Sequence, residues 1–78
     1  MDELNLRVAH NIKTLRLTQR IPRREFARRL GYSYQFVWNV ETGKVNLPLR
    51  TLHAFALQLN TDAVELMGGR HVYTAPTH

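Results

Sequence analysis

The hydrophobic positions near the N-terminus follow the period of an amphipathic helix. Leu4, Val8, Ile12 and Leu15 recur at intervals of four, four and three residues. A stripe of this kind places one apolar face of a helix against a core. The pattern therefore predicts a first helix that runs to about Leu17.

The next apolar segment is short and is bounded by a proline and a glycine. Pro22 suits the start of a helix over Arg23–Leu30, because its missing N–H has no intrahelical partner there. Gly31 can adopt the positive φ that ends a helix. Ala27 is small enough to let a second helix approach closely, so a tight helix–turn–helix crossing is expected.

A third helix is predicted over about Tyr34–Thr42. Ser33 is a favourable N-cap before it, and Gly43 suits the position that follows its last turn. Val37 and Val40 are three residues apart, so they face the same way and can fill the angle between this helix and the preceding one. The spacing of these residues is typical of a DNA-reading helix-turn-helix.

Two further helices are predicted in the second half of the chain. The first follows Pro48 and carries apolar residues on one face: Leu49, Leu52, Phe55, Ala56 and Leu59. Asn60 is expected to end it. Asp62 and Glu65 then have capping-box spacing, which opens a short helix that can cover the core with Val64, Leu66 and Met67. No segment alternates convincingly over more than four residues, so the fold class is predicted to be all-α.

The domain is expected to span residues 1–67, followed by a C-terminal tail over residues 68–78. Short termini are commonly frayed. Residues 71–74 have mild strand propensity and could instead pair with a second copy across a dimer axis. The tail is therefore either flexible or associated with a dimer.

The composition limits the kind of protein this is. The chain has 78 residues and no cysteine, which indicates one small domain without disulfides or thiolate metal sites. No apolar run approaches the ~18–20 residues that cross a bilayer. The first ten residues contain acids and no continuous apolar region, so they are not a signal peptide. A cytoplasmic protein is expected.

The positive charge is unevenly distributed. The net charge is +5 and the sequence pI is about 10.5. Six arginines fall within residues 16–29, opposed only by Glu25. A basic patch on one face suits a polyphosphate partner, although a solvated helix face would have the same composition.

The middle of the chain resembles a known family of regulators. The run FARRLGYSYQFVWNVETGKVNLP (residues 26–48), followed by LxxFALQL and DAVELM, is similar to the lambda-repressor-like family of phage and bacterial proteins, which includes Cro. The resemblance covers about residues 8–67. Phe26 stands for the first leucine of the family pattern, and the other matching positions are Ala27, Leu30, Gly31, Ser33, Val37, Val40, Glu41 and Gly43.

The resemblance implies a compact five-helix domain that binds duplex DNA, usually as a homodimer, and regulates transcription. It also implies an ion pair between Arg16 and Glu41, in which the forked guanidinium would satisfy a buried carboxylate. The chain departs from the family pattern at Pro22 and Arg23, where a Ser or Thr cap and a Gln are usual. It departs again at Trp38, where a small or polar residue is common.

The outward side of the predicted third helix carries the candidate base-reading residues, Tyr34, Gln35, Trp38 and Asn39. Gln35 and Asn39 lie four apart, and their amides can pair with adenine N6 and N7 in the major groove. Tyr34 could touch a thymine methyl or a phosphate. Trp38 has three interpretations: half-exposed packing, a sugar-phosphate contact, or a partner contact. Phe36 is expected to pack against the helices rather than contact a base.

Phosphate contacts are expected from the positive or polar residues that flank this helix and from the free N–H groups at the start of the second helix. The candidates are Arg20, Arg23, Arg24, Arg28, Thr42, Lys44 and Asn46. Arg29 is equally compatible with a solvated surface position.

The resulting prediction is a sequence-specific repressor or Cro-like regulator that binds an inverted-repeat operator as a dimer, with half-sites ~34 Å apart. In the family the dimer surface often involves the last helix and its loop, here near Leu57, Asn60, Val64, Met67 and the C-terminal tail. An antitoxin or another protein-interaction module with the same fold is the alternative. An enzyme is disfavoured, because the four histidines are scattered without metal-ligand spacing and no cofactor motif is present.

Overall fold

The computed structural model describes residues 3–68. Five helices follow one another along the chain, and no strand occurs within the described range: α1 (Glu3–Thr18), α2 (Arg23–Leu30), α3 (Tyr34–Glu41), α4 (Leu49–Gln58) and α5 (Ala63–Leu66). The all-α prediction is confirmed. None of these helices is both long and apolar enough to span a membrane.

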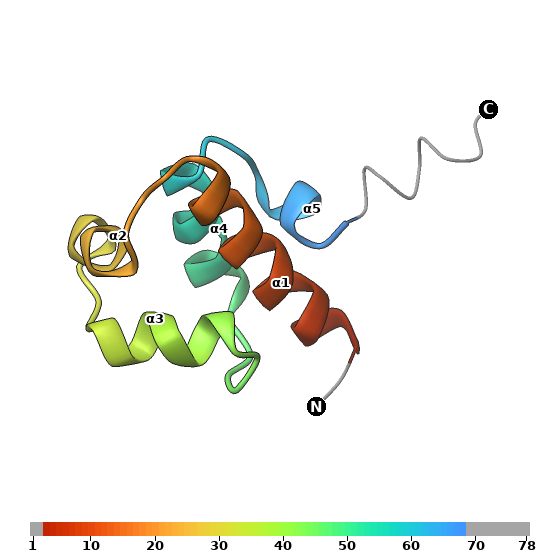
Figure 1. Cartoon of the computed structure of the whole chain (residues 1–78). Helices are drawn as coiled ribbons and strands as arrows, with labels where there is room; N and C mark the ends of the chain where they lie inside the picture. The colour runs from red at the N-terminus through yellow and green to blue at the C-terminus, as the bar shows by residue number, and fades with distance from the viewer. Residues whose placement is uncertain (1–2, 69–78) are drawn as a thin grey trace.

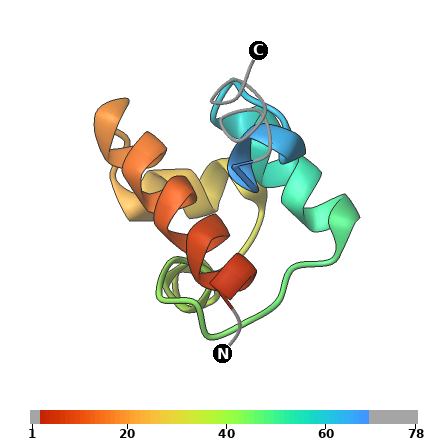
Figure 2. The same cartoon turned by 90° about the vertical axis from the view of Figure 1, so that its right-hand side faces the viewer.

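The helices surround a single core to which each contributes a fully buried side chain. α2 packs on α3, α1 contacts α3 and α5, and α4 contacts α2 and α5 (Figures 1 and 2). The innermost residues are Ile12, Phe26, Val37, Phe55 and Leu66, one from each helix in order. The rings of Phe26 and Phe55 meet edge to face with centroids 5.6 Å apart. Burying each such side chain contributes ~1.5–3 kcal/mol, so the core fixes how the five elements sit.

The bend between α2 and α3 is closed by backbone geometry and one side-chain cap. Gly31 has φ 81°, a left-handed conformation that costs a glycine little. The N–H groups of Gly31 and Tyr32 both donate to the carbonyl of Ala27, at 2.9 and 3.0 Å. Ser33 Oγ then accepts from the backbone N–H of Phe36 at 3.0 Å, which starts α3.

Three amide side chains on and just after α1 tie the other helices to it. Asn5 Nδ2 donates to the carbonyl of Gly43 at 2.9 Å, just beyond α3. Asn11 Nδ2 donates to the carbonyl of Leu66 at 2.7 Å, and Gln19 Nε2 donates to that of Leu59 at 2.8 Å. Carbonyls at helix C-termini lack intrahelical donors, so each amide satisfies a group that the helix itself cannot.

Three apolar residues predicted to face the core are exposed instead. Leu4 and Leu49 are 49% and 68% exposed. They lie at the first turns of α1 and α4, where they border an open hollow rather than closed packing. Val64 is 43% exposed because α5 is a single turn, which buries Leu66 and turns the residue two positions earlier outward.

The predicted third helix also ends one residue early. Thr42 is the C-cap of α3, with φ −98° and ψ 4°, so the helix ends at Glu41. The hydroxyl of Thr42 lies 2.9 and 3.2 Å from the carbonyls of Trp38 and Asn39, to which it donates. The next residue, Gly43, has φ 77°, a left-handed conformation that ends a helix.

Candidate nucleic-acid interface

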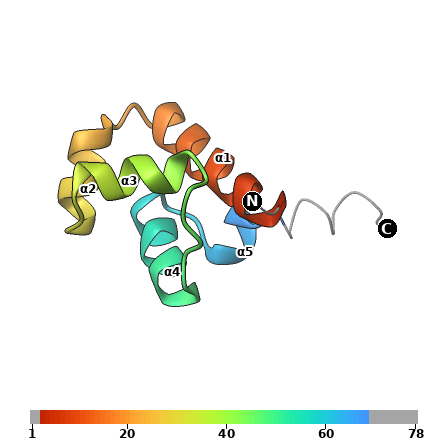
Figure 3. The ribbon, with the colours of Figure 1, turned by 90° about the horizontal axis from the view of Figure 1, so that it is seen from below.

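α3 lies on one side of the domain with one face buried and the other open. It forms the lower side of the molecule in Figure 1 and crosses the front when the domain is seen from below in Figure 3. Val37, Val40 and Glu41 are buried. On the outer side Tyr34 is 49% exposed and Trp38 38% exposed. The 3.6-residue period, anchored by the two valines, leaves a polar and aromatic row free to meet a ligand.

Two amides in that row are joined to each other. Gln35 is exposed and Asn39 half-buried, and Gln35 Nε2 donates to Asn39 Oδ1 at 3.0 Å. This bond uses one of the two Gln35 N–H groups. The Gln35 Oε1 atom and the Asn39 amide nitrogen are engaged by no other described residue. The pair therefore presents both donors and acceptors on one face.

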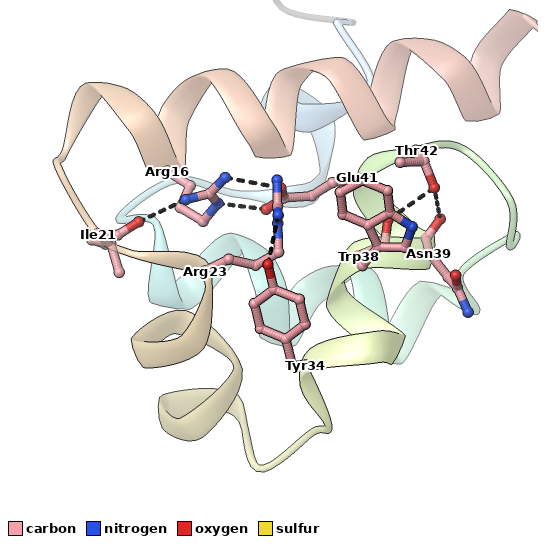
Figure 4. Close-up of polar contacts among 8 residues, drawn as sticks. All are labelled: Arg16, Ile21, Arg23, Tyr34, Trp38, Asn39, Glu41 and Thr42. Atoms are coloured by element: carbon pink, nitrogen blue, oxygen red, sulfur yellow. Dashed lines mark hydrogen bonds and ion pairs between the residues drawn. The ribbon is translucent and has the colours of Figure 1, made fainter.

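Directly behind this row is a buried ion pair between α1 and α3. Arg16 Nε donates to Glu41 Oε2 at 2.7 Å, and Arg16 Nη2 donates to Glu41 Oε1 at 3.1 Å (Figure 4). Their side chains are 5% and 0% exposed. Arg16 Nη1 also donates to the carbonyl of Ile21 at 2.8 Å. Arg16 thus satisfies both carboxylate oxygens and fixes the connection that leads into α2.

A second arginine reaches the same carboxylate from the first residue of α2. Arg23 Nε donates to Glu41 Oε1 at 3.0 Å, and Arg23 Nη1 donates to the hydroxyl of Tyr34 at 3.0 Å. Its guanidinium carbon lies 4.9 Å from the centre of the Trp38 ring and 5.7 Å from that of Tyr34 (Figure 4). The sequence suggested Arg23 as a phosphate ligand and did not place it in the Glu41 cluster.

The start of α2 opens onto a basic hollow. Its N-cap is Pro22, which provides no side-chain acceptor for the first free N–H groups of the helix. The residues that line the hollow are mostly positive: Arg16, Pro22, Arg23, Arg24, Glu25, Arg28 and Tyr34. Free amides at a helix N-terminus, together with cations, favour an anion.

One acid lies within the basic surface of α2. Glu25 accepts hydrogen bonds from Arg28 Nε at 2.9 Å and from Arg29 Nε at 3.0 Å. These bonds to Arg28 and Arg29 lower the pKa of Glu25 to about 2. The carboxylate is therefore ionised at neutral pH and offsets part of the charge of the two arginines.

The other residues proposed to contact phosphate are spread over the surface. Arg20, Arg24 and Lys44 are exposed, and Arg20 has φ 60° in the connection before α2. Asn46 instead lines the hollow between the first turns of α1 and α4. The structure brings Arg23, Arg24 and Arg28 together near Tyr34 but places Asn46 in a different surface feature.

Phe36 packs against other aromatic rings, and the two described histidines lie on the surface. Phe36 is half-buried, and its ring lies 4.8 Å from Tyr32 and 6.4 Å from Phe55 between centroids. His10 and His53 are exposed. Within residues 3–68 no three His, Cys, Asp or Glu side chains gather as a metal site would require. The tail histidines and the proposed tail strand lie outside the described residues.

Comparison with known proteins identifies the fold. No family model matches the chain, and no curated protein matches it. A solved structure does: the crystal structure of a hypothetical transcription factor, NHTF, from Neisseria. The two chains are 26% identical with a TM-score of 0.78, over 83% of this chain and 75% of the other. The domain has a transcription-factor fold.

Proposed function

We propose that this chain is a sequence-specific regulator of the lambda-repressor-like family that binds duplex DNA with α3 in the major groove. The observation that carries the proposal is the row of polar and aromatic side chains on the outer side of α3, opposite the face on which Val37, Val40 and Glu41 are buried. A helix presented in this way fits the wide groove of B-DNA, where bases show distinct donor and acceptor patterns.

The amide pair supports a specific form of base reading. Adenine offers a donor at N6 and an acceptor at N7 in the major groove. Gln35 Oε1 can accept from N6–H, and the second N–H of Gln35 can donate to N7. The first N–H already bonds to Asn39, which leaves the other N–H and Oε1 of Gln35 for the base. Each half-site should therefore contain an A·T pair whose loss costs ~1–3 kcal/mol.

The basic surface supplies the phosphate contacts in this proposal. Arg24 and Arg28 flank the free amides at the start of α2, and Arg20, Lys44 and Thr42 extend the surface. Such contacts fix the register of a protein on the duplex and carry no sequence information. Replacing one of these cations should weaken binding to every sequence and lower the salt slope by about one.

A homodimer on an inverted repeat completes the proposal. One α3 has few base-reading side chains, and two-fold symmetry doubles them, with half-sites ~34 Å apart. The exposed Leu57 and Val64 of α4 and α5 are available for the partner copy. The protein would then act on promoters in the cytoplasm of a bacterial or phage-infected cell.

The test is selection of bound duplexes from a random pool, followed by affinity measurements on the selected site. We expect a symmetric consensus and salt-dependent binding. Gln35→Ala should lose affinity for the consensus and relax selectivity at one base pair per half-site. Gln58→Ala, which removes the same kind of side chain from α4, outside α2 and α3, is the control. No enrichment, with binding to a protein partner instead, would favour an interaction module of the antitoxin kind.

A further inference from the structure

Arg23, the first residue of α2, contacts three residues on one side of α3. Its partners Tyr34, Trp38 and Glu41 follow the spacing i, i+4 and i+7, so they form a continuous line along that helix. We propose that Arg23 is a positioning residue that holds Trp38 and Tyr34 on the DNA-facing side, and that it is not a phosphate ligand. The inference rests on the proposed function and refines its site.

Two of the five N–H groups of the Arg23 guanidinium are already bonded within the protein. Arg23 Nε bonds to Glu41 and Nη1 bonds to Tyr34, each at 3.0 Å, and the side chain is only 17% exposed. A hydrogen bond to a buried carboxylate is charge-assisted and little weakened by solvent. These bonds hold the guanidinium beside α3, so a phosphate would have to reach a fixed and largely covered group. Arg24 is exposed and bonds to no other described side chain, and the exposed Arg28 bonds to Glu25 at the surface.

Arg23 is not needed to satisfy Glu41. Arg16 alone reaches both carboxylate oxygens, at 2.7 and 3.1 Å. Since Glu41 does not depend on it, Arg23 acts mainly on the two aromatic residues. It donates to the Tyr34 hydroxyl, and its guanidinium lies over the ring of Trp38. Substitution of Arg23 should leave the domain folded, because no buried charge loses its only partner.

Arg23 then sets the position of Trp38 without contacting DNA. Arg23→Lys is the decisive variant. It preserves the charge, and a lysine is a competent phosphate binder. An ammonium cannot reproduce the forked bonds to Glu41 and Tyr34 or the planar contact with Trp38. Arg24→Lys, at the next position of the same helical turn, is the matched control.

The first measurement is made on the protein without DNA. Trp38 is the single tryptophan of the chain, so its emission and acrylamide quenching report its environment directly. We expect Arg23→Lys to shift the emission to longer wavelength and increase quenching, and Arg24→Lys to leave both unchanged. Circular dichroism checks that each variant retains its helices. Unchanged Trp38 emission in Arg23→Lys would overturn the inference.

The second measurement compares the selected duplex with a scrambled one across a salt series. For Arg23→Gln we expect the same salt dependence of binding as for the wild type. The ratio of its affinity for the selected duplex to that for the scrambled one should fall by up to about tenfold, within the range of one base contact. Arg24→Gln should lower the slope by about one and leave that ratio unchanged. If Arg23→Gln also lowers the slope, Arg23 is a phosphate ligand. If the wild type binds no duplex, the proposed function fails, and the fluorescence result still decides the positioning role.

Discussion

The buried carboxylate of Glu41 offers the sharpest test of how the domain is held together. It accepts three hydrogen bonds, two from Arg16 and one from Arg23, and its side chain is fully buried. Glu41→Gln preserves the shape but replaces one acceptor oxygen with an NH₂ group. Whichever way the amide turns, its donors face arginine N–H groups that are also donors.

The magnitude follows from the burial of the pair. Removing one partner of a buried ion pair leaves an uncompensated charge and costs about 3–5 kcal/mol. A 78-residue protein has a free energy of unfolding of about 4–12 kcal/mol at 0.05–0.15 kcal/mol per residue. Glu41→Gln should therefore remove a large part of the stability of the domain.

The assay is urea denaturation followed by circular dichroism, which does not depend on Trp38 beside the mutated site. Glu3→Gln is the control, because its partner Arg7 and Glu3 itself are 43% and 87% exposed and such a pair contributes ~0–1 kcal/mol. A second variant, Arg16→Met with Glu41→Met, removes both charges and should recover part of the loss. Equal unfolding midpoints for Glu41→Gln and Glu3→Gln would refute the stabilising role of the buried ion pair.

Two other substitutions test the basic surface and the bend. Glu25→Gln raises the net charge from +5 to +6, so it should strengthen binding to scrambled duplex and steepen the salt slope; weaker binding in a salt titration would contradict this. The pKa of Glu25 is lowered from 4.5 to about 2, so its ion pairs stabilise the fold above pH 4.5 and this contribution is lost as the pH falls through about 2. In acid denaturation, Glu25→Gln should lack this pH dependence. Gly31→Ala should lower the free energy of unfolding, measured in urea, by about 1 kcal/mol. The cost comes from the left-handed φ of 81° alone, because an added Cβ would meet no atom within 4 Å. A stabilised variant would show that the left-handed conformation is not required.

The helices could be predicted from the sequence because their limits are set by local chemistry. Ser33 accepts the N3 amide of α3, and Asp62 accepts the backbone N–H of Glu65 at the start of α5. Gly31 and Gly43 adopt positive φ where the pattern placed helix ends. Each of these features depends on residues at most four apart, so no knowledge of the tertiary structure is needed to infer it.

The features that the sequence did not reveal depend on contacts between distant segments. The bond from Asn11 to the carbonyl of Leu66 joins residues 55 positions apart, and no pattern marks one surface asparagine as a cap for another helix. Leu49 has the spacing of a core residue but lies where no element covers it. The position of Arg23 was also unpredictable, because a basic residue at a helix start suits an external anion as well as an internal carboxylate.

The two kinds of contact in the proposed interface should respond differently to salt. Exposed Arg24 and Arg28 act through screened charges, so their phosphate contacts weaken steeply as salt is added. The bond between Arg23 and Glu41 is largely removed from solvent, so salt should leave the geometry of α3 almost unchanged. Total affinity should therefore fall with salt while the preference for the selected site persists. A preference that decreased in parallel with affinity would mean that α3 is held in place only by its contacts with the DNA backbone.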